Sequence, residues 1–86
     1  MYNIKFNSKS VKQYSFLKQT SFIDKVNQLL DILENNPYQN PPPFKKLKGD
    51  LKGSFSRRIN DQHRIVYQID KIHKEVRIYT MWSHYE

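Results

Sequence analysis

Hydrophobic and polar residues alternate at the start of the chain and again over its second half. Residues 2–6 (YNIKF) place three hydrophobic side chains between polar neighbours, which is the two-residue period of a half-buried β-strand. The segments 54–59, 64–69 and 76–82 show the same period. Because short polar turns separate these three segments, we predict that they pair as an antiparallel meander.

Between the first strand and the later ones, hydrophobic residues recur at helical spacing in two segments. In the first segment Val11, Tyr14 and Leu17 share one stripe, and Ser8 or Ser10 can cap its start. The polar link that follows is short, so the two helices are expected to form an antiparallel hairpin.

The second helical segment carries the strongest periodic signal in the chain. Ser21, with Asp24 three residues later, resembles a capping box at its start. Because Pro37 disfavours helical geometry at Asn36, the helix is expected to end before the proline. The hydrophobic residues at helical spacing are Phe22, Val26, Leu29, Leu30 and Leu33.

These patterns predict an α+β fold with the element order β-α-α-β-β-β(-β), in which the bracketed strand is optional. The sheet is expected to be antiparallel, with the N-terminal helical hairpin packed on one face, because both layers have one hydrophobic side to bury. The proline-rich stretch 36–44 (NPYQNPPPF) is too short for a domain linker and is predicted to be a loop that crosses the fold. Residues 1–86 are therefore expected to form a single domain.

The composition narrows the class of function. The 86 residues contain no cysteine, which excludes disulfide bonds, thiolate metal sites and a cysteine nucleophile. No stretch approaches the roughly 20 apolar residues of a membrane span, and the N-terminus lacks the apolar run of a signal peptide. We therefore expect a cytoplasmic protein with no membrane partner. The formal net charge of +7 favours a polyanionic partner, namely nucleic acid, the ribosome or an acidic protein, over a basic protein without such a partner.

Sequence motifs for a bound metal ion or cofactor are missing. His63, His73 and His84 are separated by ten and eleven residues, without a His-x-x-x-His pair or a carboxylate cluster, so no metal site is expected. Gly49 and Gly53 are the only glycines, and the segment that they bound is no phosphate-binding loop. We expect neither a metal ion nor a cofactor.

Residues 44–58 form a basic segment in which Asp50 is the single acid. One interpretation is an edge strand that lysines protect against aggregation. The other is a strip that binds RNA phosphates, with aromatic rings at Phe44, Phe55, Tyr79, Trp82 and Tyr85 that either stack on bases or pack in the core. The candidate phosphate-binding residues are Lys46, Lys48, Lys52, Arg57 and Arg58, with Lys45 beside them.

The chain also carries residues suited to RNA cleavage by the 2′-hydroxyl group. That reaction needs a base, an acid and a cation at the phosphate. Arg64, His84 and Tyr85 meet such needs if the last strand lies beside the strand of Arg64, since histidine transfers protons near neutral pH and arginine binds phosphate. A histidine near a terminus is otherwise simply exposed.

The segment 47–69 (LKGDLKGSFSRRINDQHRIVYQI) and the terminal residues MWSHYE resemble the YoeB/Txe family of bacterial toxins, in the RelE/ParE superfamily. The resemblance implies a RelE-like fold and a ribosome-dependent endoribonuclease that cleaves mRNA in the ribosomal A site without a metal ion. The implied partners are the 70S ribosome, mRNA and a cognate YefM- or Axe-like antitoxin whose acidic C-terminal segment silences the toxin. A homodimer is compatible with the resemblance.

The resemblance assigns roles position by position. Arg64 matches the family's catalytic arginine, which neutralises charge at the scissile phosphate. His84 matches the general acid, and Tyr85 matches the adjacent tyrosine. Lys48 lies in the "LK" that the family uses near the scissile phosphate, whereas Lys45 stands where the family has a glutamate proposed as the general base.

This departure leaves two functional hypotheses. The first is an mRNA endoribonuclease, and it rests on Arg64, His84 and Tyr85. The alternative is a catalytically weakened or non-nuclease member of the superfamily that acts by binding the ribosome, gyrase or antitoxin. Lys45 favours the catalytically weakened version of this alternative, because a protonated lysine cannot accept the 2′-hydroxyl proton. A small RNA-binding protein unrelated to toxins would leave the terminal His-Tyr pair unexplained.

Overall fold

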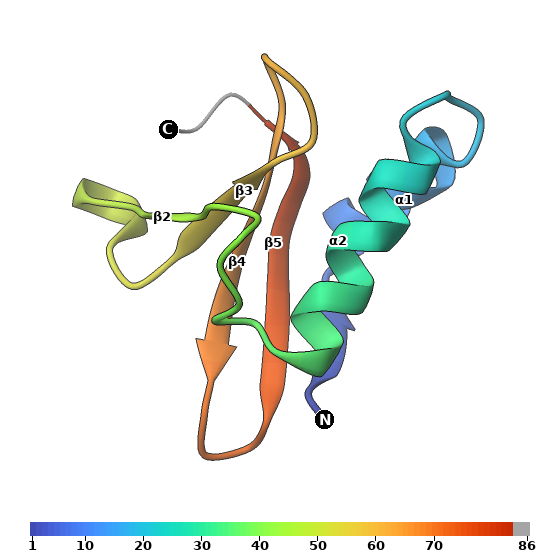
Figure 1. Cartoon of the computed structure of the whole chain (residues 1–86). Helices are drawn as coiled ribbons and strands as arrows, with labels where there is room; N and C mark the ends of the chain where they lie inside the picture. Colours follow the sequence, from blue (N-terminus) through green and yellow to red (C-terminus); the bar gives the residue numbers. More distant parts are fainter. Residues whose placement is uncertain (84–86) are drawn as a thin grey trace.

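The computed structural model describes residues 1–83, and Figure 1 shows a twisted sheet with two helices on one side. The predicted α+β class and the order β-α-α-β-β-β-β are confirmed, including the optional strand. A single 3-10 turn, η1 (Gly49–Leu51), is the one helical element outside the hairpin in the part of the chain described. The elements are β1 (Asn3–Phe6), α1 (Ser8–Leu17), α2 (Ile23–Asn35), β2 (Lys45–Lys46), β3 (Phe55–Arg58), β4 (Arg64–Asp70) and β5 (Glu75–Ser83).

The sheet has the strand order β1-β5-β4-β3-β2. Strands β3, β4 and β5 pair antiparallel, which confirms the predicted meander, and β2 adds antiparallel to β3. Strand β1 instead pairs parallel with β5, with Asn3 opposite Glu75, so the sheet is mixed. A tight hairpin imposes the antiparallel direction on consecutive strands, but β1 and β5 are joined through the whole chain and no turn restricts their direction.

The helical hairpin covers one face of the sheet (Figure 1), and the hydrophobic core lies between the two layers. Helix α2 contributes three fully buried side chains to this core, in agreement with its periodic pattern. The helix stops at Asn35, and Asn36 is extended before Pro37, as predicted. The main core residues are Leu17, Val26, Leu29 and Leu33 from the hairpin and Ile65, Tyr67, Val76, Ile78 and Met81 from the sheet.

Both predicted helix caps are wrong in detail. The N-cap of α1 is Asn7, whose side chain accepts a hydrogen bond from the Ser10 amide at 2.7 Å, while the Ser10 hydroxyl accepts one from the Asn7 amide at 2.9 Å. Ser10 is thus the far member of a capping box. Before α2, the Thr20 hydroxyl accepts from the Phe22 amide at 3.2 Å, and no side chain caps the helix itself. The turn between the helices is therefore closed by Thr20, and the predicted cap at Ser21 does not form.

Side chains of α1 continue the edge of the sheet where β1 ends. The side-chain amide of Asn7 donates a hydrogen bond to the Tyr79 carbonyl oxygen at 3.0 Å. The side-chain oxygen of Gln13 accepts one from the Met81 backbone amide at 2.7 Å. Backbone groups in a strand need hydrogen-bond partners, and here side chains supply them. As a result β5 extends as a strand to Ser83, several residues past the end of β1. No helix within residues 1–83 is long and apolar enough to cross a membrane.

Candidate functional site

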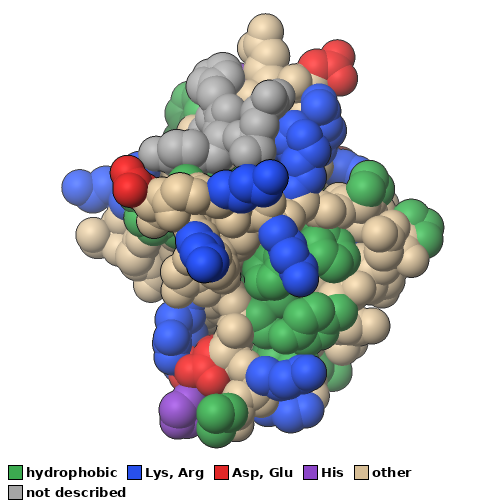
Figure 2. All heavy atoms as spheres, turned by 90° about the vertical axis from the view of Figure 1, so that its left-hand side faces the viewer, with side chains coloured by type: hydrophobic (Ala, Val, Ile, Leu, Met, Phe, Trp, Pro, Cys, Tyr) green, Lys and Arg blue, Asp and Glu red, His purple; other side chains and the backbone are tan. Residues whose placement is uncertain are grey.

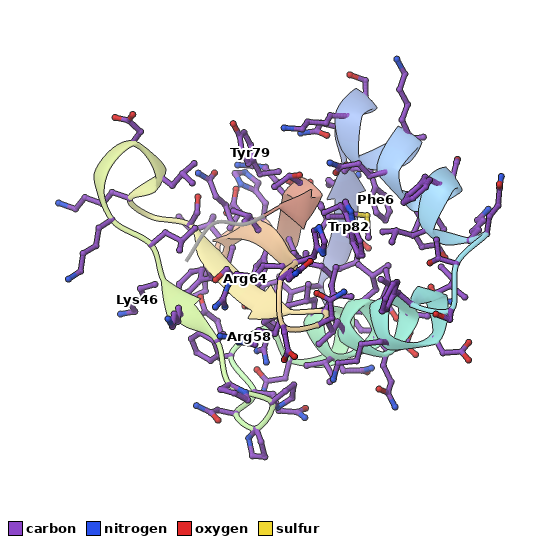
Figure 3. The ribbon with its side chains drawn as sticks, turned by 90° about the horizontal axis from the view of Figure 1, so that it is seen from above. Phe6, Lys46, Arg58, Arg64, Tyr79 and Trp82 are labelled. Carbon is purple, nitrogen blue, oxygen red and sulfur yellow. The ribbon has the colours of Figure 1, made fainter. Side chains whose placement is uncertain are left out.

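Three of the predicted cationic residues meet at one hollow. Arg58 on β3 lies directly opposite Arg64 on β4, and Lys45 on β2 lies opposite Ser56. Because side chains two residues apart in a strand share a face, Lys45, Arg58 and Arg64 lie on the same face of the sheet. They line a hollow of about 80 Å³ together with Pro43 and Phe44. Figure 3 shows Arg58 and Arg64 side by side at the centre of the molecule. The hollow is an electropositive site suited to an anion.

Arg64 occupies the inner wall of this hollow. Its residue surface is 5% exposed, whereas Arg58 and Lys45 are exposed at the rim. The Arg58 guanidinium donates to the Asp61 carbonyl oxygen at 3.2 Å, which holds it at the start of the β3–β4 turn. A guanidinium that is shielded from water acts on a bound anion through a lower effective dielectric than an exposed one. Arg64 is therefore placed to act on an anion in the hollow.

The last described residue of the chain lies beside this hollow. Ser83 is the cross-strand partner of Arg64, so the final strand does lie next to the strand of Arg64. The pairing of β4 with β5 shifts register twice, between Arg64 and Val66 and between Val66 and Tyr67. Such irregularities are frequent beside active sites, because they redirect side chains. The predicted catalytic residues His84 and Tyr85 lie outside the described residues.

Trp82, which comes just before Ser83, is packed among aromatic rings. Its ring is stacked on that of His63, with centroids 3.5 Å apart and planes 8° from parallel. The ring centroids of Phe22 and Phe16 lie 5.4 Å and 6.4 Å from that of Trp82. Of the two predicted uses of Trp82, base stacking and packing, the structure shows packing. His63 was considered in the sequence only as a metal ligand, although its place next to Arg64 was a usable signal.

The remaining predicted lysines belong to a different region. Lys46 points away from Lys45 by strand alternation, and with Lys48 and Lys52 it lines a separate hollow of about 540 Å³ around the loop between β2 and β3. The chain turns there at Gly49 and Gly53, whose φ angles of +67° and +93° disfavour other residues. Figure 2 shows Lys and Arg side chains spread over this side of the molecule. The cations do not form one continuous strip.

Arg57 requires a correction, because it does not lie on the basic surface. It is 1% exposed, and its Nε donates to the Tyr67 hydroxyl oxygen at 2.9 Å. The guanidinium carbon lies 4.8 Å from the centre of the Phe44 ring. Burial raises the pKa of the Tyr67 hydroxyl, and the Arg57 charge opposes that shift. Arg57 shares a face of its strand with Phe55, which packs against the core. Its other acceptors are the carbonyl oxygens of Pro37 (3.0 Å), Gln39 (2.8 Å) and Pro42 (2.6 Å).

Arg57 therefore acts as the anchor of the proline-rich loop. The loop runs from the end of α2 across the sheet to β2 (Figure 1), as predicted for residues 36–44. A guanidinium has five N–H donors, and here four hydrogen bonds join it to the loop and to Tyr67. This arrangement sets the position of β2, and with it the position of Lys45 at the hollow.

A second ionic cluster lies at the opposite end of β4. Asp70 accepts from the His73 amide at 3.0 Å and contacts the His73 ring and the Arg77 guanidinium, each at 2.8 Å. These hydrogen bonds from His73, with its charge and that of Arg77, lower the pKa of Asp70 to about 2. No three His, Cys, Asp or Glu side chains within residues 1–83 are grouped to hold a metal ion. The cluster stabilises the β4–β5 turn and is remote from Arg64.

The five-stranded sheet with the helical hairpin on one face is the fold of the RelE-like toxins. One solved structure of this class, the heterotetrameric YoeB–YefM toxin–antitoxin complex from Staphylococcus aureus, matches 99% of this chain and 99% of that chain, with a TM-score of 0.82 and 32% identity. The chain belongs to the family described as YoeB-like toxin of bacterial type II toxin-antitoxin system, which it matches over residues 6–85.

Curated relatives support the same family. A YoeB toxin from Synechocystis sp. is 32% identical over 68 residues, which cover 77% of this chain and 79% of the relative. A YoeB toxin from Streptomyces coelicolor is 41% identical over 44 residues, and this match covers about half of each chain (51% and 52%). The protein is thus a toxin of a type II toxin–antitoxin system.

Proposed function

We propose that the protein is a ribosome-dependent endoribonuclease that cleaves mRNA in the ribosomal A site by attack of a 2′-hydroxyl group. The observation that carries this proposal is the meeting of Lys45, Arg58 and Arg64 at one hollow, with Ser83 paired to Arg64. A scissile phosphate in this hollow would have cations on one side and Ser83, the partner of Arg64, close by.

Each group has a role that its chemistry suits. Arg64 neutralises the charge that grows on the non-bridging phosphate oxygens, where a fixed cation stabilises the transition state more than the substrate. Arg58 binds and orients the phosphate at the rim. His84, which the family resemblance assigns as general acid, protonates the 5′-oxygen leaving group, and Tyr85 orients the RNA. Because a protonated Lys45 cannot accept a proton, a water molecule takes the 2′-hydroxyl proton.

The lysines outside the hollow have a supporting role in this proposal. Lys46, Lys48 and Lys52 surround the neighbouring loop and contact flanking phosphates or ribosomal RNA. The ribosome contributes orientation, because a small surface with few acid and base groups gains most from a substrate held in a reactive geometry. The reaction proposed here proceeds without a metal ion or a cofactor.

Partners follow from the family. The relative from Staphylococcus aureus forms a heterotetramer with its YefM antitoxin. We expect this toxin to bind the acidic C-terminal segment of a YefM-like antitoxin. The negative charge of that segment is complementary to a toxin of net charge +7. The same solved relative has been described as a dimer, and homodimer formation belongs to this proposal. The toxin acts as a single domain of residues 1–86 in the cytoplasm, where its ribosomal substrate is found.

One observation favours a second candidate function, a toxin with weakened catalysis. The residue that completes the hollow from β2 is Lys45, where the family has a glutamate proposed as the general base. General-base catalysis contributes about 10²–10⁴-fold in rate. A toxin that lacks this base would cleave slowly and would inhibit translation partly by occupying the A site.

Primer extension on ribosome-bound mRNA tests both functions. Wild-type toxin is expected to produce cleavage ends in the A-site codon and to act poorly on the same RNA without ribosomes. Strong cleavage of free RNA that a chelator abolishes would contradict the proposal. Ribosome binding and inhibition of translation without any cleavage ends would establish the second candidate.

A further inference from the structure

His63 and Trp82 form a stacked pair that joins the two strands of the proposed site. The ring centroids are 3.5 Å apart and the planes differ by 8°, which is closer and more parallel than most aromatic pairs. His63 precedes Arg64 directly, and Trp82 precedes Ser83, the partner of Arg64. The stack thus lies one residue away from the pairing that brings the end of β5 to Arg64. In Figure 3, Trp82 lies on the helix side of Arg64.

His63 is held firmly by its own turn. Its amide donates to the Asn60 side-chain oxygen at 2.7 Å, and its carbonyl oxygen accepts from the Ile59 amide at 2.9 Å. The Asn60 oxygen also accepts from the Gln62 amide at 2.8 Å, so one side chain organises the whole β3–β4 turn. The His63 ring therefore projects from a well-defined backbone.

The end of β5 has less support from the backbone. Strand β1 ends at Phe6, and the pairing of β5 with β4 shifts register on both sides of Val66, just before the Arg64–Ser83 pair. The other rings on Trp82 belong to Phe16 and Phe22, which are 55% and 36% exposed themselves. The His63 stack ties the Trp82 side chain to the residue just before Arg64.

We propose that His63 is a positioning residue of the ribonuclease: its stack with Trp82 holds the end of β5 in register beside Arg64, where the scissile phosphate binds. This inference rests on the proposed function. A displacement of about 1 Å at a reacting group costs roughly 10²-fold in rate. A ring that prevents such displacement therefore affects the rate of cleavage more than the binding of substrate.

The stack can be measured without RNA, because Trp82 is the only tryptophan in the chain. Time-resolved fluorescence anisotropy of the isolated toxin reports the local motion of Trp82, and acrylamide quenching reports its accessibility. His63→Ala removes the stacking ring, and His63→Phe keeps a planar ring without proton-transfer chemistry. His63→Leu provides a second ringless variant of similar bulk if the alanine variant folds poorly, which circular dichroism will show.

We expect His63→Ala and His63→Leu to increase the local motion and quenching of Trp82 and to slow single-turnover cleavage by about 10²-fold. Affinity for the ribosome should change little, and His63→Phe should restore both anisotropy and cleavage. Unchanged Trp82 motion in the ringless variants would overturn the inference. The inference would also be overturned if Trp82 stays immobile in His63→Phe but cleavage is lost. That result would show that His63 acts as an acid or base. If wild-type toxin does not cleave, the proposed function fails, and anisotropy still decides whether the stack holds Trp82.

Discussion

Arg58 and Arg64 lie directly opposite each other on β3 and β4 and line the same hollow. Side chains of like charge at opposed positions in a sheet repel each other, so this arrangement favours an anion between them. The third cation, Lys45, reaches the hollow from β2 on the same face. The fold thus divides the basic segment 44–58. Lys45 and Arg58 line the hollow with Arg64, whereas Lys46, Lys48 and Lys52 surround the loop between β2 and β3.

Arg64→Ala should lower single-turnover cleavage of ribosome-bound mRNA by about 10²–10³-fold, the usual effect of removing one group that stabilises transition-state charge. The matched control is Arg77→Ala, since Arg77 is an exposed arginine at the far end of the β4–β5 pair, bound to Asp70 and Glu75. Primer extension with both variants measures the effect. Equal losses in the two would show that net charge, and not the hollow, supports cleavage.

Lys45→Glu should accelerate single-turnover cleavage, because a carboxylate at the rim of the hollow can accept the 2′-hydroxyl proton that a protonated lysine cannot accept. Lys45→Ala should remain active at a reduced rate if lysine only binds phosphate there. Rates on ribosome-bound mRNA for the three proteins decide the point. An inactive Lys45→Ala together with a slow Lys45→Glu would identify the lysine itself as the working group.

Arg57→Met should destabilise the fold by about 3 kcal/mol or more. The substitution leaves several buried or half-buried acceptors in the proline-rich loop unsatisfied, and each such group costs about 1–3 kcal/mol. Urea unfolding measures the change. Arg58→Met is the matched control, since Arg58 is exposed and should change the free energy of unfolding by less than about 1 kcal/mol. Similar stabilities for the two variants would refute the anchoring role of Arg57.

Binding of the antitoxin segment should weaken as salt rises from about 50 to 300 mM, because charge attraction between an acidic peptide and a basic surface is screened. Lys48→Ala and Lys52→Ala should weaken binding at low salt and reduce its salt dependence. Calorimetry with a synthetic antitoxin segment measures both. Salt-independent affinity would indicate a mainly apolar interface.

Asp70→Asn should destabilise the β4–β5 turn near neutral pH but not in strong acid. The folded-state pKa of Asp70 is lowered to about 2 from an ordinary 3.8, so its contribution is present above pH 3.8 and is lost as the pH falls towards 2. The effect should be small, because the partners of Asp70, namely His73 and Arg77, are exposed to solvent. Carboxyl NMR titration gives the pKa, and His73→Ala should raise it. A pKa near 3.8 in the wild type would contradict the role of these hydrogen bonds.

Local patterns in the sequence determined the elements of this protein. The alternation of hydrophobic and polar residues predicted the strands β3, β4 and β5. The helical spacing of hydrophobic residues predicted α2, and Pro37 predicted where it ends. The side-chain direction along a strand and the restrictions imposed by proline act within a few residues, so they are visible without tertiary contacts. Arg57 and Arg58 were both predicted to bind phosphate, although adjacent positions of a strand face opposite sides of the sheet, and the structure buries Arg57. The family motif around Arg64 was likewise readable in the sequence.

Only the tertiary structure decided which distant residues meet. Lys45 and Arg64 are far apart in sequence, and their common hollow depends on a loop that Arg57 holds through three carbonyl oxygens. The parallel direction of β1 depends on a pairing with β5 that no short turn imposes. The stack of His63 on Trp82 depends on the two register shifts near the end of the β4–β5 pairing. Register is set by the burial of a whole sheet face, which is a property of all strands together, and local sequence does not encode it.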